Sequence, residues 1–193
     1  MQSNAYMQSF VVSLLKEKLS PFYYYHNQAH TLYVEQKTIE IGGHEGCSKK
    51  EIDLLRAAAL FHDTGFINTY NGHEEESCVL ARQYLPAYRY SNNDIDIICG
   101  MIMATKIPQH PHNKLEEIIA DADLEYLGTT TVTDTAYKLY QEQQHLHPSL
   151  TEAAWNKTQI SFLKKHHYFT RFCKEQKEPA KLAYLNKLVE NNP

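Results

Sequence analysis

The sequence predicts an all-helical, compact single-domain bundle of about eight helices, and three observations support this. The 193 residues include only seven Gly and seven Pro, too few for an all-β chain full of tight turns. Apolar residues recur at helical spacing, and no segment alternates as a half-buried strand does. No repeat, low-complexity tract or linker divides the chain. We therefore expect one domain over residues 1–193.

The helix boundaries follow from capping residues at the start and from Gly or Pro at the end. Residues 6–19 stop before Pro21, and residues 25–41 are expected to stop at Gly42. Two or three further helices fill the part after residue 128. The expected helices cover residues 6–19, 25–41, 49–63, 71–84, 92–106, 113–127, 153–166 and 179–189.

The third of these helices has the clearest pattern. Ser48 is a favourable N-cap, and Glu51 three residues later completes a capping box. Towards its end the helix is apolar nearly all round, from Ala57 to Phe61. A helix of this kind is buried, so we expect it at the centre of the bundle.

The later helices are delimited mainly by Pro and Gly. The helix from residue 71 or 72 ends near Tyr84 before Pro86, and the next ends before Pro108. The helix that starts at Asn113 is expected to continue until Gly128. The remaining helices follow from apolar spacing alone.

Composition excludes several functional classes. The net charge of −4 gives no signal for nucleic-acid binding, and no segment reaches the roughly 18 apolar residues of a membrane span. The four Cys form no C-x-x-C pair, which favours free thiols in a cytoplasmic protein. We expect a monomer or a homodimer with a small-molecule partner.

Eleven His are the one anomaly of the composition, and some of them lie where a metal could bind. His26 and His30 are four residues apart and share a helix face. His62 and Asp63 end the most apolar helix, where burying an imidazole beside a carboxylate is costly without a partner. A divalent cation is such a partner, and a helix C-terminus favours a cation.

Two neighbouring carboxylates can be separated by helical period. Asp123 belongs to an apolar stripe with residues spaced by four, namely Leu115, Ile119 and Leu127. Asp121 falls on the adjacent polar stripe, so we expect it to be solvated or to support the site from outside the ligand shell. Two His and two Asp on core-facing positions make a mixed nitrogen and oxygen site. Such ligands suit Mn, Fe, Co, Ni, Zn or Mg.

The order of these segments resembles the HD-domain superfamily of metal-dependent phosphohydrolases. The opening Tyr25-His26-Asn27 with His30 is also similar to the cyclic-nucleotide phosphodiesterase branch. A group of small predicted HD phosphohydrolases is more similar still. The resemblance covers about residues 22–188. Within the single domain we expect a motif core at about 22–128 and C-terminal helices at 129–193 that pack on it. Its further motifs are Met103-Ala104-Thr105-Lys106, the loop with His110 and His112, Asp121-Ala122-Asp123-Leu124, Leu127-Gly128, Phe162-Leu163 and Tyr168-Phe169-Thr170.

The resemblance implies the roles of particular residues. The metal ligands would be His30, His62, Asp63 and Asp123. His26 would stay outside the metal shell and protonate the leaving oxygen.

One departure from the superfamily concerns a Glu that some relatives carry soon after the His-Asp pair, here His62-Asp63, which we call the HD pair. Glu74 is the best substitute for it and would orient the attacking water, although a capping box begun by Asn71 explains Glu74 equally well. His73 is a ligand for a second metal or a phosphate, or an ordinary half-buried His. Lys106 neutralises a substrate phosphate, or is a cation at a helix end.

Three classes of function remain in view. The leading one is hydrolysis of a phosphate ester in a nucleotide or a related small molecule by a metal-activated water. A second is oxygen activation by a pair of irons held by HD-type ligands, which needs further His or Asp ligands, with His73 as a candidate. A third is a non-catalytic binding module with a structural metal.

Overall fold

The computed structural model describes residues 2–192, which form ten α-helices, three short 3-10 helices and no strand. The all-helical fold class is therefore confirmed. The count exceeds the expected eight because α7 and the short α9 are not among the helices assigned from the sequence. The α-helices are α1 Gln2–Lys18, α2 Gln28–His44, α3 Lys49–Phe61, α4 His73–Tyr84, α5 Asn92–Ala104, α6 Lys114–Asp123, α7 Val132–Leu146, α8 Glu152–Lys165, α9 Arg171–Gln176 and α10 Glu178–Asn191.

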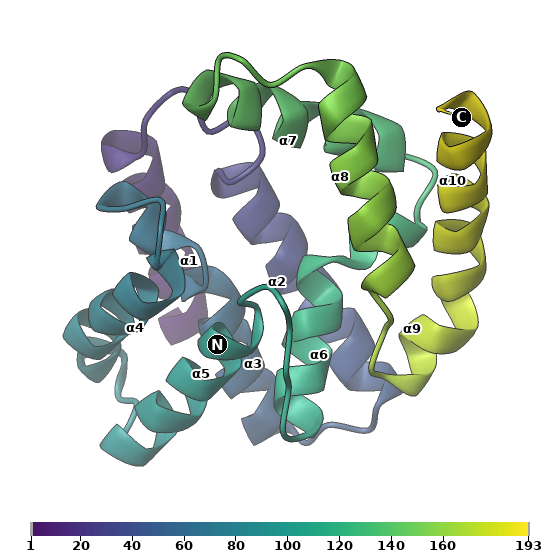
Figure 1. Cartoon of the computed structure of the whole chain (residues 1–193). Helices are drawn as coiled ribbons and strands as arrows, with labels where there is room; N and C mark the ends of the chain where they lie inside the picture. The colour runs from purple at the N-terminus through teal and green to yellow at the C-terminus, as the bar shows by residue number, and fades with distance from the viewer. Residues whose placement is uncertain (1, 193) are drawn as a thin grey trace.

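Helix α3 lies at the centre of the bundle, as its apolar pattern predicts. It contacts α2, α5, α6 and α4, and every residue from Ala57 to Phe61 is buried (Figure 1). The predicted capping box is present, because Ser48 accepts a bond from the Glu51 amide and the Glu51 carboxylate accepts one from the Ser48 amide. Burial of this apolar segment holds α3 and its C-terminal end in place.

Several predicted helix boundaries are wrong. Helix α2 begins at Gln28 and not at Tyr25, so His26 precedes the helix and does not share a helix face with His30. Gly42 does not stop α2, which continues to His44, because Gly42 packs against α3. A Cβ at this position would lie 2.7 Å from Ile52 Cδ1, so the glycine permits close contact between the helices. At a third boundary, α6 ends at Asp123 and a 3-10 helix, η3 (Glu125–Gly128), follows it.

The 3-10 helix η1 (Thr64–Ile67) packs tightly on the start of α4. A Cβ at Gly65 would lie 2.0 Å from the carbonyl oxygen of His73, which leaves no room for another residue. The Ser77 hydroxyl accepts a hydrogen bond from the Gly65 amide at 2.8 Å and donates one to the His62 carbonyl at 2.6 Å. The turn after the HD pair is therefore fixed to α4.

The C-terminal helices follow one another around the motif core. In Figure 1, α8 and α10 lie on the opposite side of the molecule from α4 and α5. Helix α10 contacts η3, α8 and α9, while α7 contacts η3 and α9 contacts α2. Within residues 2–192, none of the helices is both long and apolar enough to cross a membrane.

Candidate metal centre

Asn27 sets the position of His30 at the start of α2. Its side-chain oxygen accepts hydrogen bonds from the amides of Ala29 and His30, at 2.9 and 3.4 Å. Its side-chain nitrogen donates to the carbonyl of Tyr24 at 2.9 Å. The cap thus ties the first turn of α2 to the preceding loop, and His30 is buried in the interior.

His62 is oriented by the end of α3. Its Nδ1 lies 2.8 Å from the carbonyl oxygen of Ala59, an acceptor, so Nδ1 carries the hydrogen. In the neutral ring, which a metal requires, Nε2 then carries the lone pair, and Nε2 faces Asp63 and Asp123. A backbone carbonyl that fixes the tautomer of a His in this way is typical of metal ligands.

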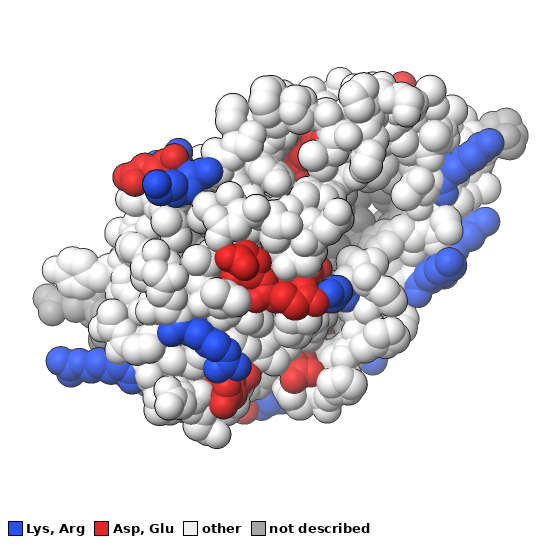
Figure 2. Space-filling model, turned by 60° about the vertical axis from the view of Figure 1, so that its left-hand side comes forward, with Lys and Arg blue, Asp and Glu red and all other residues white. Residues whose placement is uncertain are grey.

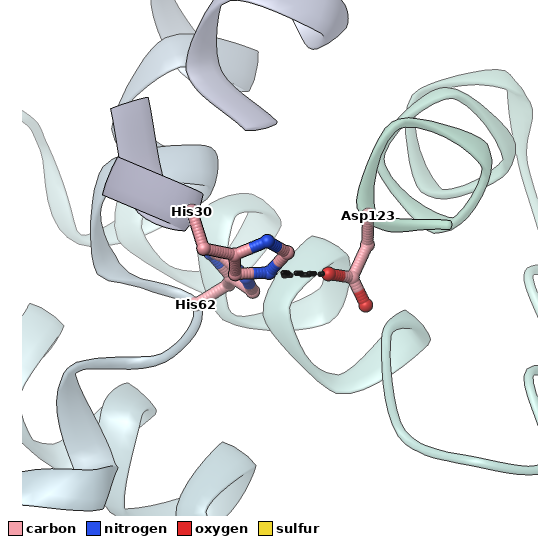
Figure 3. A group of neighbouring side chains, drawn as sticks. All are labelled: His30, His62 and Asp123. Carbon is pink, nitrogen blue, oxygen red and sulfur yellow. Dashed lines mark hydrogen bonds and ion pairs between the residues drawn. The ribbon is translucent and has the colours of Figure 1, made fainter. Parts of the chain in front are cut away.

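His30, His62 and Asp123 converge on one point from three helices (Figure 3). One ligand atom from each lies within 4.8 Å of the others, the arrangement of a group that could hold a metal ion. His30 Nε2 is 3.0 Å from Asp123 Oδ1, and His62 Nε2 is 3.5 Å from the same oxygen. Asp63 adjoins the group, with its Oδ2 at 3.1 Å from His62 Nε2 and 3.5 Å from His30 Nε2.

The chemistry of this group fits a divalent cation. His62 Nε2 and Asp63 Oδ2 are both buried, and apart from each other, at 3.1 Å, neither has a hydrogen-bond partner. Buried polar atoms left unpaired are costly, and a cation between them would satisfy both. Imidazole and carboxylate ligands together suit several divalent transition metals.

The charges of the group depend strongly on one another. Burial alone lowers the pKa of His62, but the carboxylates of Asp63 and Asp123 outweigh it and raise this pKa well above its usual value. Burial raises the pKa of Asp63, but the charge and hydrogen bond of His62 outweigh it and lower that pKa. Burial also raises the pKa of Asp123, but His30 and His62 outweigh it and lower that pKa. Both carboxylates are therefore ionised, which a metal ligand requires.

His26 lies outside this group, against Glu142 from α7. The Glu142 side chain is buried and accepts hydrogen bonds from the amides of Tyr25 and His26, at 3.0 and 3.1 Å. Its other oxygen contacts Nδ1 of His26. Burial lowers the pKa of His26, but the hydrogen bond to Glu142 and the charges of Asp63, Glu142 and Asp123 together outweigh burial, so the pKa is raised. Glu142 therefore leaves Nε2 as the nitrogen of His26 that is available for proton exchange.

His73 and Glu74 extend the polar cluster at the start of α4. His73 Nε2 is 3.7 Å from Asp63 Oδ1, and His73 Nδ1 is 3.6 Å from Glu74 Oε2. The capping-box interpretation of Glu74 is wrong, because the N-cap is Gly72 and no side chain caps this helix. Glu74 is buried instead.

Of the two alternatives for Asp121, the solvated one is wrong. Asp121 is fully buried and accepts hydrogen bonds from the amides of Phe169 and Thr170 and from the Thr170 hydroxyl, at 2.9, 2.8 and 2.6 Å. It thereby fixes the segment that precedes α9. Lys106 directly follows Thr105, the C-cap of α5; it is exposed and forms an ion pair with Glu75.

Comparison with known proteins identifies the family of this chain. A family model of the HD domain matches residues 28–127, half of the chain. The chain belongs to the HD domain family. No curated protein matches it significantly.

Two solved structures resemble this HD domain. One is a predicted HD superfamily hydrolase from an uncultured Thermotogales bacterium, with a TM-score of 0.65 and 16% identity over 95% of this chain and 89% of that one. The other is Bacillus subtilis YpgQ in complex with ADP, with a TM-score of 0.67 and 15% identity over 100% of this chain and 96% of that one. Identities this low show a shared fold.

We call His30, His62, Asp63 and Asp123 the metal group. A cavity of about 430 Å³ opens beside it. Asp63, Asp123 and His26 line one side of it, and aromatic residues such as Trp155 and Phe162 of α8 line the other. This volume lies in the range of small-molecule sites. Sequence reasoning missed Glu142 and Trp155, and it noted Phe162 only within a motif, without a role at the site.

Proposed function

We propose that this HD domain is a metal-dependent phosphohydrolase that cleaves a phosphate ester in a nucleotide or a related small phosphorylated molecule. The carrying observation is the convergence of His30, His62, Asp63 and Asp123, with buried unpaired atoms, at the wall of a cavity of substrate size. The fold shared with YpgQ, whose structure contains ADP, supports a nucleotide as the ligand class.

The metal ligands in this proposal are the four residues of the group. A divalent cation held there would lower the pKa of a water molecule and polarise the oxygens of a phosphoryl group. Mn, Fe, Co, Ni, Zn and Mg are all compatible with these ligands. Asp63 has a second role, because its Oδ1 is directed to His73 and away from His62, where it can orient a nucleophile.

His26 is the proposed general acid. Glu142 holds Nδ1 and raises the pKa of the ring, so that a proton is retained at Nε2 on the cavity wall. Glu74 lines the same cavity and would orient the attacking water. Lys106 also lines it, and because it is paired with Glu75 it would contribute little to neutralising phosphate oxygens.

One observation favours the second candidate, a two-metal centre. Asp63 has its two oxygens directed to different partners, Oδ2 to His62 and Oδ1 to His73. If two ions were bound, Asp63 would help to hold both, and His73 would be a ligand of the second. Two tightly bound irons per chain together with oxygen consumption would favour the oxygenase function.

The test of the hydrolase function uses protein stripped with a chelator and reloaded with each metal in turn. Nucleoside mono-, di- and triphosphates and cyclic nucleotides are then offered, and phosphate release is measured. We expect turnover that requires the metal. A flat result for every metal and substrate would contradict the proposal and favour the binding module.

A further inference from the structure

A second cavity, of about 720 Å³, lies between α8 and the loop that joins α5 to α6. It adjoins the first cavity, because Ile107, Thr158 and Phe162 line both. The two cavities therefore share a wall at Phe162, and together we call them the groove, with Asp63 and Asp123 at one end. We call the far part, beyond Phe162, the distal cavity.

The groove has opposite charges at its two ends. Carboxylates line the metal end, where the one lysine, Lys106, is paired with Glu75. Lysines line the distal cavity, together with histidines, and none of its lining residues is an Asp or Glu. On the face drawn in Figure 2, acidic side chains gather beside a hollow near the middle, and basic side chains lie along the right-hand edge.

The lysines of the distal cavity are Lys157 and Lys165 of α8. They are eight residues apart, with Ser161 halfway between them, so all three lie on one helix face. Among the described residues neither lysine has a carboxylate partner, whereas Lys37, Lys106 and Lys177 each have one. Both are exposed, and their charges leave a positive field along the groove wall.

We propose that the distal cavity binds a second anionic group of the same substrate molecule. This inference rests on the proposed function, in which the first phosphate lies at the metal. The substrate class is then an elongated phosphorylated molecule with an anionic group at each end. A planar middle, such as a nucleobase, would pack on Phe162. Lys157 and Lys165 both lie outside the region that the family model matches, so this subsite is a feature of the chain's C-terminal helices.

The experiment measures binding rather than turnover. Calorimetry on the metal-loaded full chain compares two matched pairs of probes that differ by one phosphate: adenosine 5′-phosphate with adenosine 3′,5′-bisphosphate, and NAD with NADP. The variants are Lys157→Ala/Lys165→Ala and, as a control on the same helix, Lys164→Ala. Lys164 is exposed and does not line the distal cavity.

We expect the added phosphate to improve affinity by about tenfold in at least one pair, since a charged hydrogen bond contributes about that factor. The double variant should lose this advantage and keep the affinity for the probe that lacks the phosphate. Lys164→Ala should behave as the wild type.

Equal affinities within both pairs would overturn the inference, as would an advantage that survives in the double variant. A separate anion in the distal cavity also overturns it, and is recognised when pyrophosphate and adenosine 5′-phosphate bind the wild type together. Because binding needs no catalysis, a protein with the expected pattern but no turnover would refute the hydrolase function alone. A hydrolase insensitive to these lysines would refute the subsite alone.

Discussion

One cavity is bordered by the metal group on one hand and by residues of the C-terminal helices on the other. The two regions differ in whether their buried polar atoms have hydrogen-bond partners. In the metal group, His62 Nε2 and Asp63 Oδ2 are buried and have no hydrogen-bond partner apart from each other. In α7, both oxygens of the buried Glu142 have partners on His26 or its neighbour. Unpaired atoms that converge indicate a missing ligand, whereas fully paired ones indicate a positioning role.

The largest expected effect comes from a substitution in the metal group. Asp63→Asn removes a charge that the cation needs, so we expect loss of bound metal and a fall in turnover of roughly a thousandfold. Metal analysis and phosphate release on one preparation measure both. Asp134→Asn, an exposed change in the first turn of α7, is the control. Full metal content and activity in Asp63→Asn would refute the assignment.

The next prediction concerns Asp121, which joins the metal side to the C-terminal helices. Burial raises the pKa of this carboxyl to about 6, although hydrogen bonds from Thr170 and Phe169 lower it. A folded-state pKa above the unfolded value means that the folded state binds the extra proton. Its contribution to stability is therefore full below about pH 4 and is lost as the pH rises through 6, by roughly 2 kcal/mol.

Asp121→Asn has no such proton. Denaturant unfolding of both proteins at pH 4, 5, 6 and 7 isolates the term, because all other carboxyls are shared. We expect the stability of the wild type relative to the variant to decrease over this range. A constant difference would show that the carboxyl titrates at its ordinary pKa in the folded protein.

A smaller effect tests the C-terminal side. Glu142→Gln keeps the shape but removes the charge that raises the pKa of His26. We expect turnover to fall about tenfold with metal content unchanged, and the alkaline limb of the pH–rate profile to move to lower pH. His26→Ala should lose more rate and lack this limb. Loss of metal in either variant would place His26 among the ligands.

The smallest effect is expected at Lys106. Its side chain is exposed and already paired with Glu75, so a substrate phosphate gains little from it. Lys106→Ala should change turnover by less than about threefold, as measured by phosphate release over a range of salt concentrations. Glu75→Ala, which frees the lysine, is the matched control. A large loss in Lys106→Ala would make it a phosphate ligand.

The sequence allowed the metal side to be predicted better than the C-terminal side, for physical reasons. His62 and Asp63 follow a helix whose apolar pattern alone requires burial, so an ionisable pair there needs a partner. Glu142 acts on His26 across 116 positions of the chain, and no local pattern records such a contact. Helical period separated Asp123 from Asp121, but the segment before α9 covers the stripe that period assigns to solvent. Tertiary packing overrode the pattern.

The closeness of Gly65 to the His73 carbonyl has a consequence for how the protein tolerates change. Since even a methyl group there would meet backbone at 2.0 Å, every side chain larger than hydrogen must push α4 away from the turn. That shift would separate Ser77 from the carbonyl of His62 and move both residues of the HD pair together. In a saturation library, position 65 should therefore behave as an all-or-none determinant of metal content, although it carries no ligand atom of its own.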